Sequence, residues 1–190
     1  MNLAQAQKYA AHFVQWLAPY CDRIEIAGSI RRERPVCGDV DLVCIPKTEI
    51  TRDLLGVTGA RNLLWEFLRA YVASGKAKFQ SGGDQPGKFA ILILPKCQLD
   101  VYFATESTWG SILIQRTGSK EHNIWLATRA RARGREWKPY EGLYDPEENH
   151  MAHFREEQDL YAALGLEMIE PKNREYDWLR RNVTAERVAL

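Results

Sequence analysis

The chain has 190 residues, of which 45% are hydrophobic and 27% are charged, and its formal net charge is +1. This composition is typical of a globular domain and argues against intrinsic disorder. No apolar run approaches the roughly 18 residues that cross a bilayer, and the N-terminus has no secretion signal, so we expect a cytoplasmic protein without membrane contact. The four cysteines form no C-x-x-C pair, which favours reduced thiols over disulfides or a zinc site.

Helix and strand signals alternate in the first half of the chain. Apolar residues at helical spacing predict a helix over residues 2–18, and the alternating RIEIAG predicts a strand that ends at Gly28. DVDLVCIP predicts the next strand, and after a loop residues 60–74 have the pattern of an amphipathic helix. After the turn-rich SGGDQPG, two strands, KFAILIL and QLDVYFA, are expected to form a hairpin.

Helical signals dominate the second half, from about Thr105 onward. Helices are predicted over residues 107–116, 119–133 and 154–164, with the short extended stretch WKPYEGLYD before the last of them. The final YDWLRRNVTAERVAL has the pattern of another amphipathic helix. We therefore predict an α+β protein in three parts: a mixed unit over residues 1–105, a mostly helical unit over 106–175 and a helical extension over 176–190.

The stretch GSIRRERPVCGDVDL, residues 28–42, combines features that suit a phosphorylated ligand. Gly28 and Ser29 follow a predicted strand, where a tight turn exposes backbone N–H groups that bind phosphate. Arg31 and Arg32 are close enough to that turn for one guanidinium to hold phosphate oxygens with two parallel hydrogen bonds.

Asp39 and Asp41 lie at the start of the following strand, where residues two apart point to the same face. Both carboxylates stay ionised only with a cation between them, and Mg²⁺ prefers such oxygen ligands. Asp100 is a third acidic residue, placed inside an otherwise apolar strand. Three aspartates on neighbouring strands are what a two-metal site for phosphoryl or nucleotidyl transfer needs. The Gly-Ser turn, the paired arginines, the two close aspartates and the later single aspartate are each common. Their occurrence in this order along the chain is what specifically indicates a nucleotidyl-transfer site.

In this order of motifs the chain resembles the family X DNA polymerases, the polymerase-beta-like branch of the nucleotidyltransferase superfamily. GSIRRERPVCGDVDL resembles the palm signature of that family, and LDVYFATESTWGSILIQRTGSKEHN resembles the segment with the third aspartate and the entry to the thumb. EEQDLYAALGLEMIEPKNRE resembles part of the family's C-terminal ending. The resemblance implies a nucleotidyltransferase palm, a mixed sheet with flanking helices, over residues 1–105 and a thumb over 106–175.

The resemblance also implies a set of site residues. Asp39, Asp41 and Asp100 would be the catalytic ligands of two Mg²⁺ ions, with Mn²⁺ as a substitute, and Asp100 would lie nearest the primer 3′-hydroxyl. Gln115 and Arg116 stand where the family usually has an aromatic pair beside the sugar. The full set expected to bind the nucleotide is Gly28, Ser29, Arg32, Gly38, Gln115, Arg116, Gly118, Ser119 and Asn123.

Basic residues gather near the end of the predicted helix 119–133, with Glu136 opposing them, in a pattern that suits DNA phosphates. A solvated helix end, whose cations favour the helix C-terminus, has the same pattern. His150 and His153, near two glutamates, favour a surface loop over a metal site. We expect DNA contacts from Lys120, Arg129, Arg131, Arg133 and Lys138.

These observations lead us to expect a monomeric, template-directed DNA polymerase. It would add deoxynucleotides from dNTPs to the 3′-end of primer–template or gapped DNA, distributively and in short-gap repair, in the cytoplasm, a nucleoid or a viral factory. The first predicted helix begins almost at Met1, so no N-terminal lyase domain is expected. Two alternatives stay open: a nucleotidyltransferase whose acceptor is an RNA 3′-end or a protein hydroxyl, and a catalytically inactive scaffold that binds DNA ends.

Overall fold

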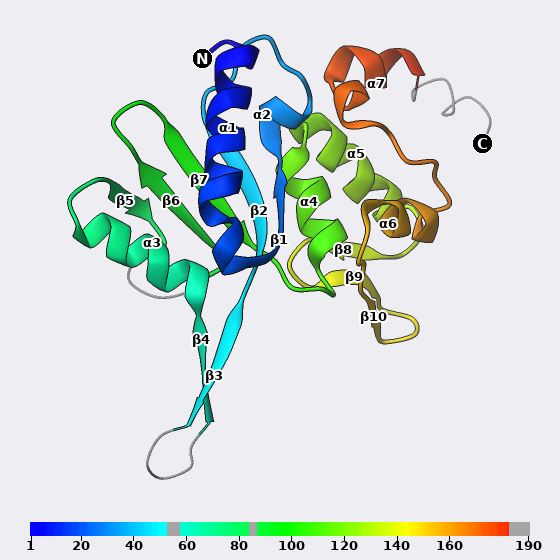
Figure 1. Cartoon of the computed structure of the whole chain (residues 1–190). Coiled ribbons are helices and arrows are strands. Elements are labelled where there is room, and N and C mark those ends of the chain that lie inside the picture. The colour runs from blue at the N-terminus through cyan, green and yellow to red at the C-terminus, as the bar shows by residue number, and fades with distance from the viewer. Residues whose placement is uncertain (53–57, 84–86, 183–190) are drawn as a thin grey trace.

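A five-stranded sheet is the centre of the first half of the molecule (Figure 1). The computed structural model describes residues 1–52, 58–83 and 87–182. The sheet has the strand order β1-β2-β7-β6-β5; β2 and β7 run parallel, and the other neighbours are antiparallel. Its strands are β1 (Cys21–Ile26), β2 (Val40–Pro46), β5 (Lys78–Ser81), β6 (Phe89–Ile93) and β7 (Gln98–Phe103).

Helices cover both faces of this sheet, so alternate residues of β2 enter two different apolar clusters. Leu42 and Cys44 pack with α1 (Leu3–Leu17) and α3 (Leu63–Ala73). Val43 and Ile45 pack with α4 (Trp109–Thr117) on the opposite face. Burial on both faces explains why β2 is an almost continuous apolar run, as is usual for a strand inside a covered sheet.

The second half forms its own apolar core between helices and a small sheet. Leu126, Phe154 and Leu160 are buried there, together with Ile114 from α4. Because α4 also packs against β2, it connects the two halves. The elements of this half are α5 (Lys120–Arg131), β8 (Glu136–Lys138), β9 (Gly142–Asp145), β10 (His150–Ala152), α6 (Glu157–Ala163) and α7 (Tyr176–Asn182), with strand order β10-β9-β8.

Buried charges also join the two halves. The Glu157 carboxylate, at the start of α6, accepts hydrogen bonds of 2.9 and 2.7 Å from Arg31 and one of 2.8 Å from Arg174. Arg174 is completely buried, and Arg31 also donates to Thr117 Oγ1 over 2.8 Å. Arg31 belongs to α2 (Gly28–Arg31), so this cluster fixes the short helix beside β2 against the second half.

The α+β architecture and the β6–β7 hairpin agree with the sequence prediction. The boundaries at residues 105 and 175 stay predictions. Of the predicted C-terminal helix, α7 covers Tyr176–Asn182 and the remainder lies outside the described residues. Among the described helices, none has the length and apolarity to cross a membrane.

Several short elements differ from the prediction. The segment expected to be a loop and the start of a helix forms a hairpin of β3 (Thr48–Arg52) and β4 (Thr58–Asn62), which projects from the sheet (Figure 1). Most side chains of β3 are exposed, so its sequence lacks the alternation that marks a half-buried strand. The strands β5 and β10, the four-residue helix α2, and two 3₁₀ turns, η1 (Ala18–Tyr20) and η2 (Pro171–Asn173), were also not predicted.

Candidate active site

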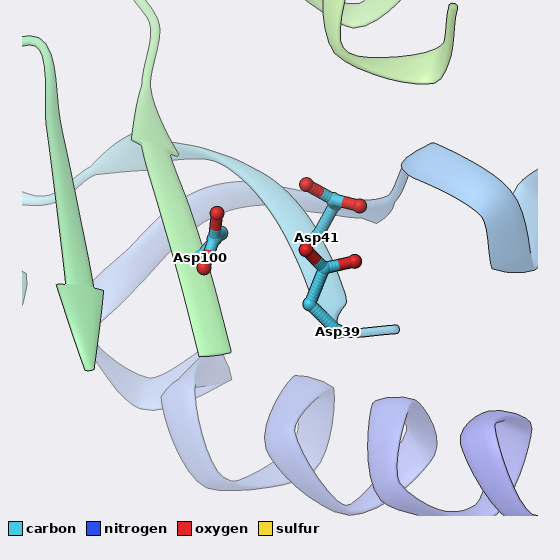
Figure 2. A group of neighbouring side chains, drawn as sticks. All are labelled: Asp39, Asp41 and Asp100. Carbon is cyan, nitrogen blue, oxygen red and sulfur yellow. The ribbon is translucent and has the colours of Figure 1, made fainter. Parts of the chain in front are cut away.

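Three aspartates converge where β2 and β7 begin (Figure 2). The parallel register places Asp41 directly opposite Asp100, and Asp39 immediately precedes β2. One carboxylate oxygen of each residue lies within 4.8 Å of the others. Asp39 and Asp41 are half-buried and Asp100 is buried. Among the described residues, this is the single group of three or more potential metal ligands that meets this spacing.

The surroundings of two of these carboxylates, Asp41 and Asp100, raise their pKa values in the absence of a bound cation. Burial, together with the charges of Asp39 and Asp100, raises the pKa of Asp41 to about 7, although Arg116 and Arg32 act in the opposite direction. Burial also raises the pKa of Asp100, against the effect of its hydrogen bonds. A divalent cation would relieve this repulsion, and a donor set of carboxylate oxygens alone fits Mg²⁺ or Mn²⁺.

A cleft of about 620 Å³ begins beside Asp39 and Asp41 and extends along α4 and α5. Gly38 and Ser119 do not line it: Gly38 is exposed beside Asp39, and Ser119 is the buried N-cap of α5. Lys120, which we expected to contact DNA, does line it. Seven of the nine residues predicted to bind the nucleotide line the cleft: Gly28, Ser29, Arg32, Gln115, Arg116, Gly118 and Asn123.

Four of these residues carry buried polar atoms without a hydrogen-bond partner. The atoms are Ser29 Oγ, Gln115 Oε1, Arg116 Nε and Asn123 Oδ1. Buried polar atoms are nearly always paired in folded proteins, and an unpaired one needs an explanation such as a missing ligand. All four residues line the same cleft, so the buried polar atoms without a protein partner are concentrated around it.

The two adjacent arginines have different partners. Arg31 is held by Glu157 and does not line the cleft, which favours a structural role. Arg32 lines the cleft; its Nε donates to Glu175 over 2.7 Å and its Nη1 donates to the carbonyl of Thr117. These two contacts leave further N–H donors on the Arg32 guanidinium, which has five in all.

The residues expected to contact DNA do not form one patch. Arg131 lies eleven residues, or about three helical turns, after Lys120, so the two share the face of α5 that borders the cleft. Arg129 lies about two and a half turns after Lys120, on the opposite face, and with Arg133 it lines a separate hollow of about 620 Å³. Lys138 pairs with Glu136 over 3.3 Å. The DNA contacts stay predictions.

Sequence reasoning missed several residues that support the site. Glu157 holds Arg31 from far along the chain and also accepts a hydrogen bond from Arg174, and no local pattern indicated these pairings. Gln98 and Tyr102 both donate to the Asp100 carboxylate. Strand alternation predicts that Gln98 shares the face of Asp100 and could have identified Tyr102 in the same way, because residues two before and two after Asp100 lie on its face.

Comparisons with known proteins show what the chain resembles in sequence and in fold. The sequence model of the family described as DNA polymerase beta thumb matches residues 112–175. The DNA polymerase/3′-5′ exonuclease PolX of Bacillus subtilis (strain 168) is 29% identical over an alignment of 152 residues, and the match covers 78% of this chain and 24% of that protein. The chain therefore spans about a quarter of the length of this curated relative.

Two solved structures of Leishmania infantum polymerase beta share the fold. The ternary P/T complex has a TM-score of 0.67, with 19% identity and coverage of 92% of this chain and 76% of that chain. The ternary gap complex has a TM-score of 0.68, also with 19% identity, and coverage of 92% and 70%. At this identity the likeness concerns the fold, and it extends over nearly the whole chain.

Proposed function

We propose that this chain, a polymerase-beta-like protein of family X, is the palm and thumb of a template-directed DNA polymerase. Its substrates would be a dNTP and the 3′-end of a primer on primer–template or gapped DNA. The observation that carries this proposal is the position of the three aspartates at one end of a cleft whose walls hold unpaired polar atoms. This arrangement suits a nucleotide with its phosphates at the carboxylates.

In the proposed reaction, the primer 3′-oxygen forms a bond to the α-phosphorus of the dNTP. The bond between that phosphorus and the oxygen bridging to the β-phosphate breaks, and pyrophosphate leaves with the electron pair. Asp39, Asp41 and Asp100 would hold two divalent ions, which supply charge stabilisation for the attacking and leaving oxygens. Asp100 is suited to accept the proton of the 3′-hydroxyl, because burial raises its pKa.

The other residues of the cleft would bind and orient the nucleotide. Ser29 and the remaining donors of Arg32 would contact the triphosphate, with the backbone of Gly38 nearby. Gly118 and Asn123, at the junction of α4 and α5, would lie along the sugar and base. We propose that synthesis is distributive and serves short gaps, since the described cations that face the cleft from α5 are few.

The test is primer extension on gapped, recessed and single-stranded DNA with Mg²⁺ or Mn²⁺. Extension that requires a template supports the proposal. Untemplated addition, or transfer to RNA or protein, would favour a nucleotidyltransferase with another acceptor. DNA binding without any transfer would favour an inactive scaffold. Asp100→Asn should abolish extension and leave DNA binding intact, whereas the matched control Asp22→Asn, at an exposed position of β1, should extend primers normally.

A further inference from the structure

Each oxygen of the Asp100 carboxylate accepts a hydrogen bond from a neighbour on its own strand. Gln98 Nε2 donates to Oδ1 over 2.8 Å, and Tyr102 Oη donates to Oδ2 over 3.1 Å. The three residues alternate along β7 and therefore share one face. Two donors on opposite oxygens fix the plane of the carboxylate. Each oxygen keeps a lone pair for a further ligand, because a carboxylate oxygen has two.

The donor Tyr102 is itself held from another element. The Arg116 guanidinium carbon, on α4, lies 3.9 Å from the centre of the Tyr102 ring. Arg116 Nη2 donates to Tyr140 Oη over 3.2 Å, and Tyr140 Oη donates to the carbonyl of Lys88 over 3.2 Å. The guanidinium is thus fixed at one end by Tyr140, and its carbon lies over the Tyr102 ring. These contacts connect α4, the loop after β8 and the sheet around one tyrosine.

We infer that Tyr102 is a positioning residue for Asp100, and that Arg116 acts by holding the Tyr102 ring in place. This inference rests on one part of the proposed function, the role of Asp100 as a metal ligand. Loss of a hydrogen-bonded partner that orients a metal ligand typically lowers the metal affinity of the site by about 10–100-fold. The role assigned to Arg116 depends on its planar shape as well as its charge, because a lysine ammonium cannot cover the ring in the same way.

A purely electrostatic role for Arg116 predicts a different result. A cation near three carboxylates opposes the binding of a second cation, so a change that keeps the charge should then leave metal affinity unaltered. If Arg116 holds Tyr102, replacement by lysine should weaken metal binding even though the charge is retained. The variants Tyr102→Phe and Arg116→Lys both preserve net charge, and Tyr102→Phe also preserves the ring under Arg116.

The experiment measures Mn²⁺ binding to the full chain, without nucleotide or DNA, from the electron paramagnetic resonance signal of free Mn²⁺. We expect Tyr102→Phe to lower Mn²⁺ affinity about tenfold, in line with the loss of a partner that orients a metal ligand. Arg116→Lys should lower it in the same direction. Tyr9→Phe, which removes a hydroxyl from a half-buried tyrosine on α1, is the control and should bind Mn²⁺ like the parent.

Unchanged Mn²⁺ affinity in Tyr102→Phe would overturn the inference, and unchanged affinity in Arg116→Lys alone would overturn the role of Arg116. Primer extension supplies a second readout: Tyr102→Phe should lower kcat and leave the KM for dNTP unchanged. A parent chain that binds Mn²⁺ but extends no primer would contradict the proposed function without affecting this inference. Thermal unfolding of each variant, expected at the temperature of the parent, separates these effects from loss of structure.

Discussion

The α carbon of Gly28 lies so close to the Asp41 side chain that a β carbon at Gly28 would be 1.8 Å from Asp41 Oδ2. Gly28 begins α2 and has a φ of +59°, a conformation that side chains with a β carbon rarely adopt. The backbone around it is further fixed by a 2.9 Å hydrogen bond from the N–H of Ala27 to the carbonyl of Asp41. Glycine is therefore required here both by conformation and by the space that the carboxylate occupies.

Gly28→Ala should abolish Mn²⁺ binding and primer extension, because the new methyl group would displace the Asp41 carboxylate. Gly134→Ala is a matched control: its φ is +71°, but nothing lies within 4 Å of the added β carbon. That change should cost about 1–2 kcal/mol of stability from backbone strain and leave both activities in place. Normal Mn²⁺ binding by Gly28→Ala would contradict the close contact with Asp41.

Metal binding should depend steeply on pH because the pKa of Asp41 is raised to about 7, first by burial and then by its acidic neighbours. A metal ligand must be deprotonated, so the ion has to displace a proton below this pH. We expect Mn²⁺ affinity to fall about tenfold per pH unit below pH 7 and to level off above it. Calorimetric titrations in buffers of different ionisation enthalpy would measure the proton release. Affinity that is constant between pH 5 and pH 7 would contradict the raised pKa.

The raised pKa of Asp41 also predicts how the stability of the metal-free protein depends on pH. Between the unfolded pKa of about 4 and the folded value of about 7, the folded state binds a proton at Asp41 that the unfolded state lacks. The contribution of Asp41 to stability is therefore largest below pH 4 and is lost as the pH rises through 7. Asp41→Asn should remove this component, which chemical unfolding at several pH values would detect.

The buried ion-pair cluster of Glu157, Arg31 and Arg174 should contribute strongly to the free energy of unfolding. Burial alone would raise the pKa of Glu157, but its hydrogen bond to Arg31 and the charges of Arg174 and Arg31 outweigh burial and lower it. Glu157→Gln would leave two arginines without their carboxylate, which costs about 3–5 kcal/mol when a buried pair is broken. The stabilisation is present above the ordinary pKa of about 4.3 and is lost as the pH falls through the lower, folded value.

Glu156 provides a control for the stability effect of Glu157→Gln. It pairs with Arg23 over 2.7 Å, but the two side chains are 47% and 37% exposed. Solvent screens such a pair, so Glu156→Gln should change the free energy of unfolding by about 1 kcal/mol or less. Urea unfolding of both variants at pH 7 tests the difference. Equal effects would mean that the buried cluster does not secure the second half against α2.

Substitutions on the two sides of α5 and the turn that follows it should have different effects on DNA binding. Arg131 shares the face of Lys120 beside the cleft, so Arg131→Ala should weaken DNA binding and reduce the salt slope by about 1. Arg133 lines the other hollow, and Arg133→Ala should leave the slope unchanged. Fluorescence anisotropy with gapped DNA from 50 to 200 mM salt, a range that resolves such slopes, would measure both. The opposite pattern would place the DNA on the face that carries Trp125.

The sequence alone predicts the chemistry that we propose for the site, because the residues that suggest it form short-range patterns. Two aspartates separated by one residue at the start of a predicted strand are expected to share a face, although Asp39 in fact lies just before β2, and a Gly-Ser pair after a strand favours a phosphate turn. The apolar spacing of α1 and the short apolar stretches of β6 and β7 are equally local, so these elements were predicted with nearly correct bounds. Gly28 could be recognised in the sequence as part of a turn. Its close approach to the Asp41 carboxylate, which requires a glycine there, could not be predicted.

The tertiary structure decided every relationship between distant residues. The parallel register of β2 and β7 sets Asp41 opposite Asp100, and no local pattern specifies which strands become neighbours. Arg31 and Arg32 look equivalent in the sequence, yet a glutamate 126 residues away engages Arg31 and leaves Arg32 at the cleft. Side-chain periodicity reports only which face a residue occupies, whereas the partner on that face depends on packing between elements far apart along the chain.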